Sequence, residues 1–322
     1  MPTTARLLRR LKSLKRFLYV IPVMFVVGMV VFITMHVAPG DPVAMLLGDE
    51  ATPKAIEKLR EAMDLNKPLY QQLFEWFGRV IRGDMGQSIF MRRSVNSAIL
   101  EHLEATFLLT ILSMFLSVIL GVIIGVIAAV RHNRLLDYIV MFASSLGVAI
   151  PVFWLGLMLI LVFALMVHWL PAVGYVPISR GTPLVTLKYL ILPSLALAMG
   201  QASLLARMTR ANMLEVLQSD YVRTARAKGQ TESVVIFKHA LKNAFLPVVT
   251  VIGLSFANVM GGAVVTEQIF NIPGIGRLLI TSVARRDYPV IEGIVIYIAA
   301  TYVLINLIVD LIYTYLDPRV KV

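Results

Sequence analysis

Six long apolar stretches divide the chain, and polar or charged segments separate them. They run from Phe17 to Val37, Ala105 to Val130, Tyr138 to His168, Leu190 to Ala206, Ala244 to Val265 and Val290 to Leu316. A helix rises about 1.5 Å per residue, so about 20 residues cross a hydrocarbon core of roughly 30 Å. The pattern predicts an all-α membrane protein with six transmembrane helices, the fourth short and the third and sixth longer than one crossing needs.

The composition agrees with this pattern. Hydrophobic residues make up 58% of the chain and charged residues 15%, whereas about a quarter of the residues in a soluble domain are charged. All 30 Lys and Arg fall outside the six stretches, as expected because each would cost about 2.5 to 3.5 kcal/mol at a span centre. Basic residues beside apolar segments do not form a nucleic-acid-binding face. The absence of cysteine excludes disulfides, thiol catalysis and thiolate metal ligands.

Basic residues also predict the orientation of the spans. With six spans, one side holds both termini and the two loops Arg131 to Asp137 and Arg207 to Asn243, with 17 Lys and Arg, while much longer loops on the other side hold 13. The positive-inside rule then places both termini in the cytoplasm. The predicted parts are a basic N-terminus (1–16), a first span (17–37), an extracytoplasmic helical loop (38–104), a core with five spans (105–316) and a C-terminus (317–322).

The first external loop is long enough to hold helices of its own. Thr52 and Pro53 are typical of the first positions of a helix, and Pro68 opens a second candidate. The apolar stripes are Ile56, Leu59 and Met63 in the first, and Leu69, Leu73, Phe77 and Val80 in the second. This loop either caps the spans or contributes a docking surface for a soluble partner.

Two other external loops are rich in Pro and Gly. The segment from Trp169 to Pro183 is expected to be irregular, with Trp169 and Tyr175 at the membrane interface. The segment from Thr266 to Pro289 contains the sequence NIPGIG. Its residues Asn271, Pro273, Gly274 and Gly276 form a candidate periplasmic gate. Non-helical backbone is tolerated at membrane depth only where protein or water satisfies it, so the loop either re-enters the mouth of a cavity or stays outside.

A polar interruption begins at Asp220, between the fourth and fifth spans. Ser219 or Asp220 can cap a short helix, Gly229 can end it, and Thr231 can cap the next helix. Val222, Ala225 and Gly229 would share a face that a partner's backbone can approach. The following helix would carry a stripe of Val234, Phe237, Leu241 and Ala244 beside another of Lys238 and Lys242. From spacing alone the segment is either a docking element or a solvated basic connector.

Few polar residues lie within the predicted spans. Asn306 and Asp310 are one helical turn apart, Asn258 lies in the fifth span, and Pro151 is expected to bend the third. These four residues are candidates for a translocation path or for helix packing. Gly121 with Gly125, and Ala257 with Gly261, give spacings that favour close helix packing and weakly indicate a dimer face.

Several catalytic and binding motifs are missing from the sequence. It contains no G-x-x-x-x-G-K-[ST] phosphate loop, no G-x-S-x-G elbow and no H-E-x-x-H, and its five histidines are scattered. We therefore expect no catalytic residue, metal site or bound cofactor in this chain. A self-sufficient secondary transporter or channel is the alternative function, but such carriers usually need intramembrane ionisable residues near the midplane.

At least ten motifs, in order along nearly the whole chain, resemble the permease subunits of ATP-binding-cassette (ABC) importers of the dipeptide, oligopeptide and nickel class. They include PGDPV, DLNKPLYQQ, RGDMGQS, PVFWLGLMLI, ILPSLALA, RMTRANMLEVLQSDYVRTARAKG, KHALKNAFLPVVTVIG, NIPGIGRLL, RRDYPV and NLIVDLIYTYLDPRV. The resemblance implies the type I ABC importer permease fold. It also implies a coupling helix at about 219–230 that sits in a groove of an ATPase subunit.

The resemblance assigns the coupling role residue by residue. The implied ATPase-coupling residues are Asp220, Tyr221, Val222, Arg223, Thr224, Ala225, Arg226, Ala227, Lys228 and Gly229. The general importer pattern is Glu-Ala-Ala, three residues, Gly, nine residues, then Ile-x-Leu-Pro, and Ala225, Gly229 and Leu241 match it. The departures are Arg223 and Thr224 for Glu and Ala, His239 for Ile, and Lys242 for Pro. Roles of that Glu in salt bridges therefore do not carry over.

The resemblance also implies partners and a location. A second, related permease in a heterodimer, two ATP-binding subunits that hold ATP and Mg²⁺, and an extracytoplasmic substrate-binding protein are expected, in a bacterial inner membrane. The implied substrate is a di- or oligopeptide, with glutathione, opines, sugars and nickel as alternatives.

Overall fold

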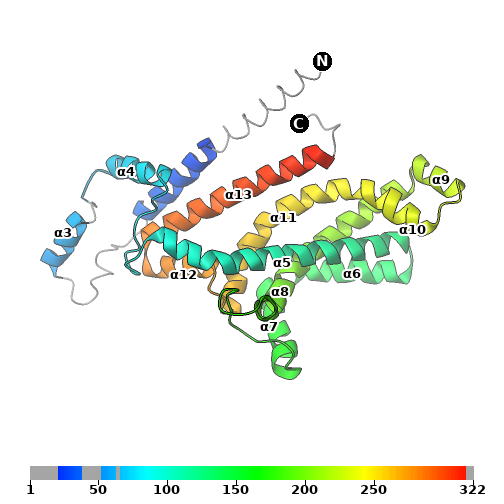
Figure 1. The fold of residues 1–322 in the computed structure, drawn as a ribbon, viewed down its shortest axis with the longest axis horizontal. Helices are drawn as coiled ribbons and strands as arrows, with labels where there is room; N and C mark the ends of the chain where they lie inside the picture. The colour runs from blue at the N-terminus through cyan, green and yellow to red at the C-terminus, as the bar shows by residue number, and fades with distance from the viewer. Residues whose placement is uncertain (1–20, 38–51, 63–65, 317–322) are drawn as a thin grey trace, which may run out of the picture. The chain divides into compact units, whose positions relative to one another are not determined.

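The computed structural model describes residues 21–37, 52–62 and 66–316, except for the side chains of Ala55, Leu59, Ala62 and 310–316. The described part is all helical (Figure 1), with a single isolated bridge between Gln87 and Ser94. The helices are Ile21–Val37, α3 (Pro53–Ala62), α4 (Leu69–Ile81), α5 (Val95–Val130), α6 (Leu135–Ala149), α7 (Val152–Leu159), η2 (Ile160–Met166), α8 (Pro183–Leu217), α9 (Asp220–Ala227), α10 (Glu232–Val234), η3 (Val235–Ala240), α11 (Leu241–Ile269), α12 (Ile275–Arg285) and α13 (Tyr288–Leu316). The predicted all-α class is confirmed.

The chain divides into two compact units. The first contains Met1–Leu103 and Leu278–Leu307, and the second contains Glu104–Arg277 and Ile308–Val322. The predicted domain boundaries at 16, 37, 104 and 316 follow membrane topology, which this division does not test. Residues 1–16 and 317–322 lie outside the described residues.

Helix α4 provides the core of the first unit. Its Trp76 packs with Phe32 of the first helix and Ile296 of α13, and Leu73, Phe77 and Val80 surround this cluster. Three of the four residues of the predicted stripe therefore face the core, but Leu69 is exposed because it starts the helix. The start of α3 at Pro53 also agrees with the prediction, although Met63 and the side chain of Leu59 are outside the described part. Packing on the first and last spans favours the cap over a purely docking role.

A buried aspartate joins two distant segments of the first unit. Asp287 is 2% exposed and accepts hydrogen bonds from the hydroxyl of Ser88 and from the backbone N–H groups of Ile89 (3.1 Å) and Phe90 (3.2 Å). The guanidinium of Arg285 lies 3.9 Å from the centre of the Phe90 ring. The motifs RGDMGQS and RRDYPV are therefore in direct contact.

Helix α8 is the centre of the second unit. It packs against α6, α7 and α11. Its buried residues Leu190, Leu192, Ala196 and Leu197 belong to a core that also contains Leu109, Phe270 and Ile272. A Cβ atom added to Gly121 would lie 2.6 Å from the Cβ of Leu205, and one added to Gly125 would lie 2.6 Å from the backbone oxygen of Ala206. Both glycines are thus used for close packing of α5 on α8 inside the chain, and the weak prediction of a dimer face there is wrong.

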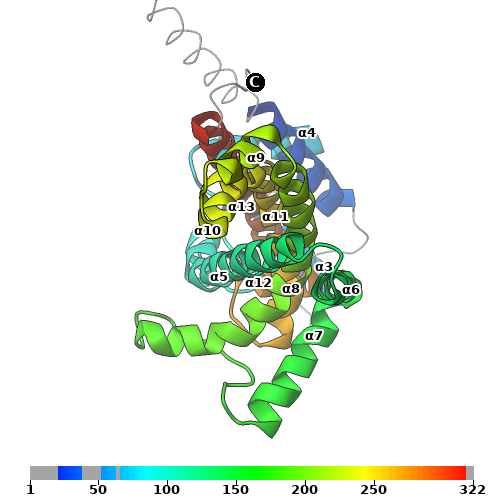
Figure 2. The same ribbon diagram turned by 90° about the vertical axis from the view of Figure 1, so that its right-hand side faces the viewer.

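The predicted third span is broken in two. Helix α6 ends at Ala149, α7 begins at Val152 after Pro151, and the two segments are bent by 105° (Figure 2). Pro151 cannot donate a backbone hydrogen bond to the preceding turn, which explains a break at this position. The predicted bend at Pro151 is confirmed, and the bent pair can still count as one span.

The helices that contain the second and fourth predicted spans are longer than the apolar pattern indicated. Helix α5 begins at Val95, ten residues before Ala105, and α8 has 35 residues where the apolar stretch Leu190 to Ala206 has about half that number. Among the described residues, four helices are long and apolar enough to cross a membrane, five with the bent pair, and the first helix is shorter. The number of six spans remains a prediction.

The loop between η2 and α8 is irregular, as expected. The hydroxyl of Tyr175 donates a 2.8 Å hydrogen bond to Glu104, which also accepts one from the backbone N–H of Ile178 (2.8 Å). Burial and the neighbouring Glu104 carboxylate raise the pKa of Tyr175 above its usual value. Tyr175 therefore fixes this loop to α5, while Trp169 is 74% exposed.

Candidate functional site

The predicted coupling segment forms the short helix α9. It begins after Ser219, which has extended backbone angles, and ends in a left-handed turn at Gly229, where φ is +75°. The N–H of Gly229 bonds to the carbonyl of Arg226 (2.9 Å), and the N–H of Gln230 bonds to that of Ala225 (3.3 Å). This pair of bonds is the Schellman arrangement that a glycine after a helix permits. The predicted start and stop of the helix are confirmed.

The predicted side-chain caps are not formed. The hydroxyl of Ser219 donates to the backbone oxygen of Val216 (2.6 Å), in the preceding turn, and Thr231 makes no capping hydrogen bond to α10. Ser219 therefore helps to end α8 rather than to start α9.

One face of α9 is buried within the chain. Val222 is fully buried and Ala225 is 8% exposed, and both pack with Val235 of η3 and with Val216 and Leu217 at the end of α8. The expectation that Val222 and Ala225 present a surface to a partner's backbone is wrong, because their side chains hold α9 in place. Residues of the opposite face are exposed: Asp220, Tyr221, Arg223, Thr224, Arg226, Ala227, Lys228 and Gly229.

Polar contacts connect α9 to the segment that follows it. The side-chain amide of Asn243 on α11 donates to the hydroxyl of Tyr221 (2.7 Å). Arg226 pairs with Glu232 across the turn (2.9 Å), although both side chains are exposed and such a pair contributes little stability. Together with the buried face, these contacts make α9 part of one packed element with the end of α8 and the start of α11.

A stretch of π-helix changes which residues face the core after α9. In η3, Val235 and Ala240 are buried, followed by Ala244 in α11, whereas Phe237 is 61% exposed. The predicted stripe holds for Leu241 and Ala244, which pack in one core cluster, but it is wrong for Phe237. A π-helix adds a residue to the turn and rotates the side chains relative to an α-helix. Phe237 is left as an exposed aromatic near the basic residues Lys238 and Lys242.

The exposed surface of this region has the character of a protein-binding surface. It combines two exposed aromatic residues, Tyr221 and Phe237, with the basic residues Arg223, Arg226, Lys228, Lys238 and Lys242. Aromatic residues and Arg are enriched at protein interfaces. We call these seven residues the α9 surface. Its basic character suits an acidic partner.

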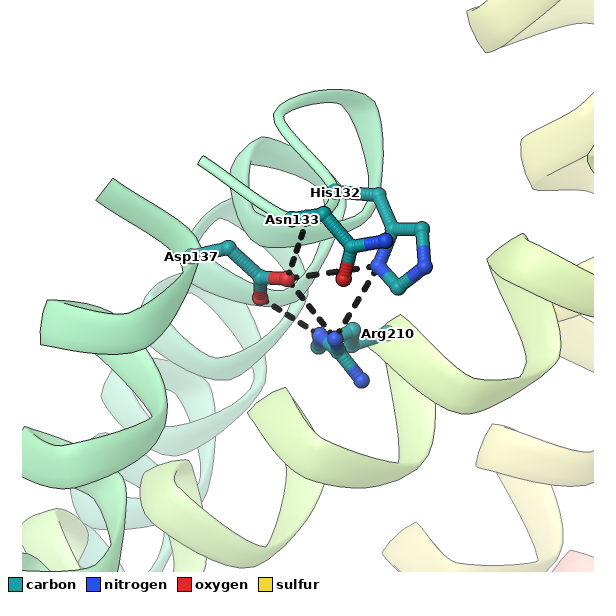
Figure 3. Close-up of polar contacts among 4 residues, drawn as sticks. All are labelled: His132, Asn133, Asp137 and Arg210. Atoms are coloured by element: carbon teal, nitrogen blue, oxygen red, sulfur yellow. Dashed lines mark hydrogen bonds and ion pairs between the residues drawn. The ribbon is translucent and has the colours of Figure 1, made fainter. Parts of the chain in front are cut away.

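An ion pair that the sequence did not reveal fixes the loop between α5 and α6 to α8 (Figure 3). Arg210 donates from Nε to one oxygen of Asp137 (2.6 Å) and from a terminal nitrogen to the other (2.7 Å). The same carboxylate accepts the backbone N–H of Asn133 (3.1 Å) and faces Nδ1 of His132 (3.3 Å). Asp137 is 2% exposed on its side chain and Arg210 is 22% exposed. Two-point contact fixes the orientation of both groups.

The candidate gate residues are organised by a second buried acid, Glu267. Its carboxylate accepts the hydroxyl of Thr106 (2.6 Å) and the backbone N–H of Arg277 (2.8 Å), and the Thr106 hydroxyl accepts the N–H of Ile275 (2.8 Å). A Cβ atom on Gly274 would overlap this carboxylate, and one on Gly276 would lie 2.6 Å from Val264.

The structure thus brings Gly274 and Gly276 together around Glu267, while Asn271 and Pro273 are exposed. Asn271 has a left-handed backbone, with φ of 53°. Sequence reasoning missed Glu267, although an acid at the end of an apolar stretch was a signal. The role of this loop as a gate, and its re-entry, remain predictions.

The other candidate residues are not gathered into a site. Pro151 lies at the α6–α7 break, Asn258 is exposed on α11, and Asn306 lies on α13. The side chain of Asp310 is outside the described part. No group of three or more His, Asp or Glu that could hold a metal occurs among the residues that the structure describes.

The sequence matches two family models that together cover most of its length. The model of the binding-protein-dependent transport system inner membrane component matches residues 121–322, and the corresponding N-terminal model matches residues 9–110. The α9 surface, Arg210 and the candidate gate all lie within the first match.

Proteins named as permeases match this chain over nearly its full length. The chain is 44% identical over 308 residues to a probable peptide ABC transporter permease protein of Sinorhizobium fredii, covering 96% of this chain and 98% of the relative. It is 42% identical over 328 residues to a dipeptide transport system permease protein of Alkalihalophilus pseudofirmus, with the same coverage. It is also 42% identical over 308 residues to a glutathione transport system permease protein of Escherichia coli.

A solved structure shares the fold. The inward-facing MetNI methionine ABC transporter matches with a TM-score of 0.57 at 18% identity, covering 68% of this chain and 96% of that chain. The predicted type I ABC importer permease fold is confirmed by this likeness. With the family models and the full-length relatives, it shows that the chain belongs to the family of binding-protein-dependent transport system inner membrane components.

Proposed function

We propose that this chain is the permease subunit of an ATP-driven importer, which receives a substrate from an extracytoplasmic binding protein and passes it into the cytoplasm. The substrate class we favour is a di- or oligopeptide. Three relatives that match nearly the whole chain are named as permeases for peptides, dipeptides and glutathione, all of which contain amide-linked amino acids. These names support this substrate class.

The geometry of α9 is the observation that best supports coupling between this chain and the ATP-binding subunits. Its inner face is buried against α8 and η3, and its outer face is exposed and basic. A partner that binds the α9 surface would therefore move the ends of α8 and α11 together with α9. In this proposal, closure of two ATP-binding subunits moves α9 and opens the translocation path to the other side of the membrane.

The proposal requires several partners. Two ATP-binding subunits hold ATP and Mg²⁺ and carry out the hydrolysis, a second related permease completes the path, and a binding protein delivers the substrate. The chain itself serves as a transport subunit and carries out no reaction. Both termini and the α9 surface lie on the cytoplasmic side of the inner membrane, according to the distribution of Lys and Arg.

Purification of the chain from its native membrane tests this function. We expect a second permease and ATP-binding subunits to copurify in near-equal amounts with it. Reconstituted in liposomes with the binding protein, the complex should take up peptides only when ATP is present on the side of the α9 surface. Recovery of the chain alone, with substrate uptake that does not depend on ATP, would contradict the proposal and favour a secondary carrier.

A further inference from the structure

A cavity in the first unit has no role in the proposed transport cycle. It has a volume of about 220 Å³ and lies where the first helix, α4 and the start of α13 meet. Its lining includes three aromatic residues, Phe32, Trp76 and Tyr288, and three charged residues, Glu75, Arg79 and Glu292. We call this space the α4 cavity.

A buried carboxylate lines the α4 cavity. Glu292 is 4% exposed and lines the cavity together with Trp76. Its oxygen Oε1 is buried and has no hydrogen-bond partner among the residues that the structure describes. A buried charge without full pairing is strongly unfavourable, so this oxygen needs a donor or a cation from elsewhere.

The lining favours an organic ammonium group over a metal ion. Calcium and magnesium need about six or more oxygen ligands, whereas Glu292 offers one oxygen without a partner and shares the cavity with the rings of Phe32, Trp76 and Tyr288. Aromatic faces attract ammonium groups. The other acid, Glu75, already pairs with Lys67 at 3.0 Å, and His36 places one ring nitrogen 2.8 Å from the backbone oxygen of Phe32 and the other 3.2 Å from Gln72.

The cavity also contains a cation that suits an anionic group. The side chain of Arg79 lines the cavity and is exposed, and its guanidinium has the geometry to bind a phosphate through two hydrogen bonds. A ligand with an ammonium group and a phosphate a few bonds apart would therefore find a partner for each charge.

The exposed apolar surface of the first helix indicates that this ligand is the headgroup of a lipid. Its apolar side chains are exposed along its length, among them Phe25, Val26, Val30 and Ile33. The cavity includes His36, at the last turn of this helix, which is predicted to reach the extracytoplasmic surface. A headgroup would lie at this level while its acyl chains cover the exposed apolar face.

We propose that the α4 cavity binds the headgroup of an aminophospholipid, with the primary ammonium on Glu292 and the phosphate on Arg79. A primary ammonium can donate a hydrogen bond to Oε1, but a quaternary ammonium cannot. The site therefore binds phosphatidylethanolamine in preference to phosphatidylcholine. It also rejects phosphatidylglycerol, which has no ammonium group to pair with Glu292.

The test measures lipids retained by the purified full-length protein, together with any subunits that copurify. The protein is reconstituted in nanodiscs that contain equal amounts of phosphatidylethanolamine, phosphatidylcholine and phosphatidylglycerol, released into mild detergent, and analysed by native mass spectrometry. We expect a preference for phosphatidylethanolamine that falls by about tenfold in Glu292→Gln, because one charge-assisted hydrogen bond is lost. Arg79→Gln should weaken retention of phosphatidylethanolamine and phosphatidylcholine alike, since both carry the phosphate.

Matched controls separate this site from general effects. Glu61→Gln removes an exposed carboxylate of the same unit, on α3, and should leave the preference unchanged. Equal retention of the three lipids by the unmodified protein would overturn the proposal. So would an unchanged preference in Glu292→Gln, or an unchanged amount of retained phosphatidylethanolamine in Arg79→Gln. Displacement of the lipid by dialanine at lower concentration than by phosphoethanolamine would assign the cavity to a peptide instead, and would overturn it too. If Glu292→Gln does not fold, the result for Arg79→Gln decides.

Discussion

Asp137 illustrates how a single side chain can determine the position of a whole loop. Four groups surround its carboxylate: both donors of the Arg210 guanidinium, the N–H of Asn133 and the ring of His132. Because the carboxylate is almost completely buried, each lost partner leaves a desolvated charge. The loop between α5 and α6 therefore depends on a residue that lies 73 positions before its partner.

Asp137→Asn should destabilise the protein by about 1 to 3 kcal/mol, because the amide cannot compensate the Arg210 charge. The measurement is the apparent melting temperature in detergent. Limited proteolysis of the α5–α6 loop shows whether the loop remains packed on α8. Asp220→Asn is the matched control, since Asp220 is fully exposed and lies 3.9 Å from Arg223, and it should leave the apparent melting temperature nearly unchanged. Equal effects of the two substitutions would show that the ion pair contributes nothing.

A glycine at the candidate gate, Gly274, can be compared in the same way with a glycine in α11, Gly261. Gly274→Ala should destabilise by about 1 to 3 kcal/mol, because the added methyl group overlaps the Glu267 carboxylate, which Thr106 and the N–H of Arg277 already hold. Gly261→Ala should be neutral or stabilising by up to about 1 kcal/mol, because no atom lies within 4 Å of the added Cβ. Thermal stability of the two variants checks this, and a stable Gly274→Ala would mean that the loop can move away from Glu267.

At the scale of the element, the structure separates what is local from what depends on distant parts of the chain. The stop of α9 follows from Gly229, so the sequence alone was enough to predict it. The start at Asp220 was also predicted, although the side-chain cap expected there is not formed. The exposure of Phe237 was not predictable, because it depends on a π-helical turn that the apolar spacing does not reveal. The roles of Glu267, Asp287 and Asp137 were missed for another reason: each depends on partners 73 or more positions away.

Helix ends and bends follow the same division. Pro151 indicated a bend, but the angle of 105° depends on how α7 packs against α8 and α11. The extension of α8 to Leu217 was missed because the polar residues after Ala206 read as a loop, although nothing in them prevents a helix from continuing. Hydropathy located the membrane-crossing part of this helix, and tertiary packing set its full length.

The turn after α9 leads to a prediction for coupling. Gly229→Val should reduce ATP-dependent uptake by roughly tenfold, because a left-handed backbone costs a residue with a side chain about 1 to 2 kcal/mol and the Schellman turn would open. ATP hydrolysis by the complex should continue. The control is Gly229→Asn, since Asn tolerates the left-handed region, and it should retain most of the uptake. Equal uptake by the two variants would remove the turn from the coupling mechanism.

At the scale of the whole molecule, each of the two units has a core of its own. In the first unit, α4 packs on the first helix and α13 through Trp76. In the second unit, α8 packs against α6, α7 and α11. The α4 cavity belongs to the first unit and the α9 surface to the second. Sequence reasoning anticipated this separation only as a difference between an external loop and a core of spans.

The predicted orientation places α3 outside the cell membrane and α9 inside, and the lack of cysteine makes this directly testable. Glu61→Cys on α3 and Thr224→Cys on α9 replace exposed residues, and each introduces a single thiol into an otherwise thiol-free chain. A membrane-impermeant maleimide added to intact spheroplasts should label Glu61→Cys, and it should label Thr224→Cys only after permeabilisation. Copurified ATP-binding subunits should protect Thr224→Cys but leave Glu61→Cys reactive. The opposite labelling pattern would reverse the orientation, and because ATP is cytoplasmic it would also remove α9 as the site at which ATP-binding subunits act.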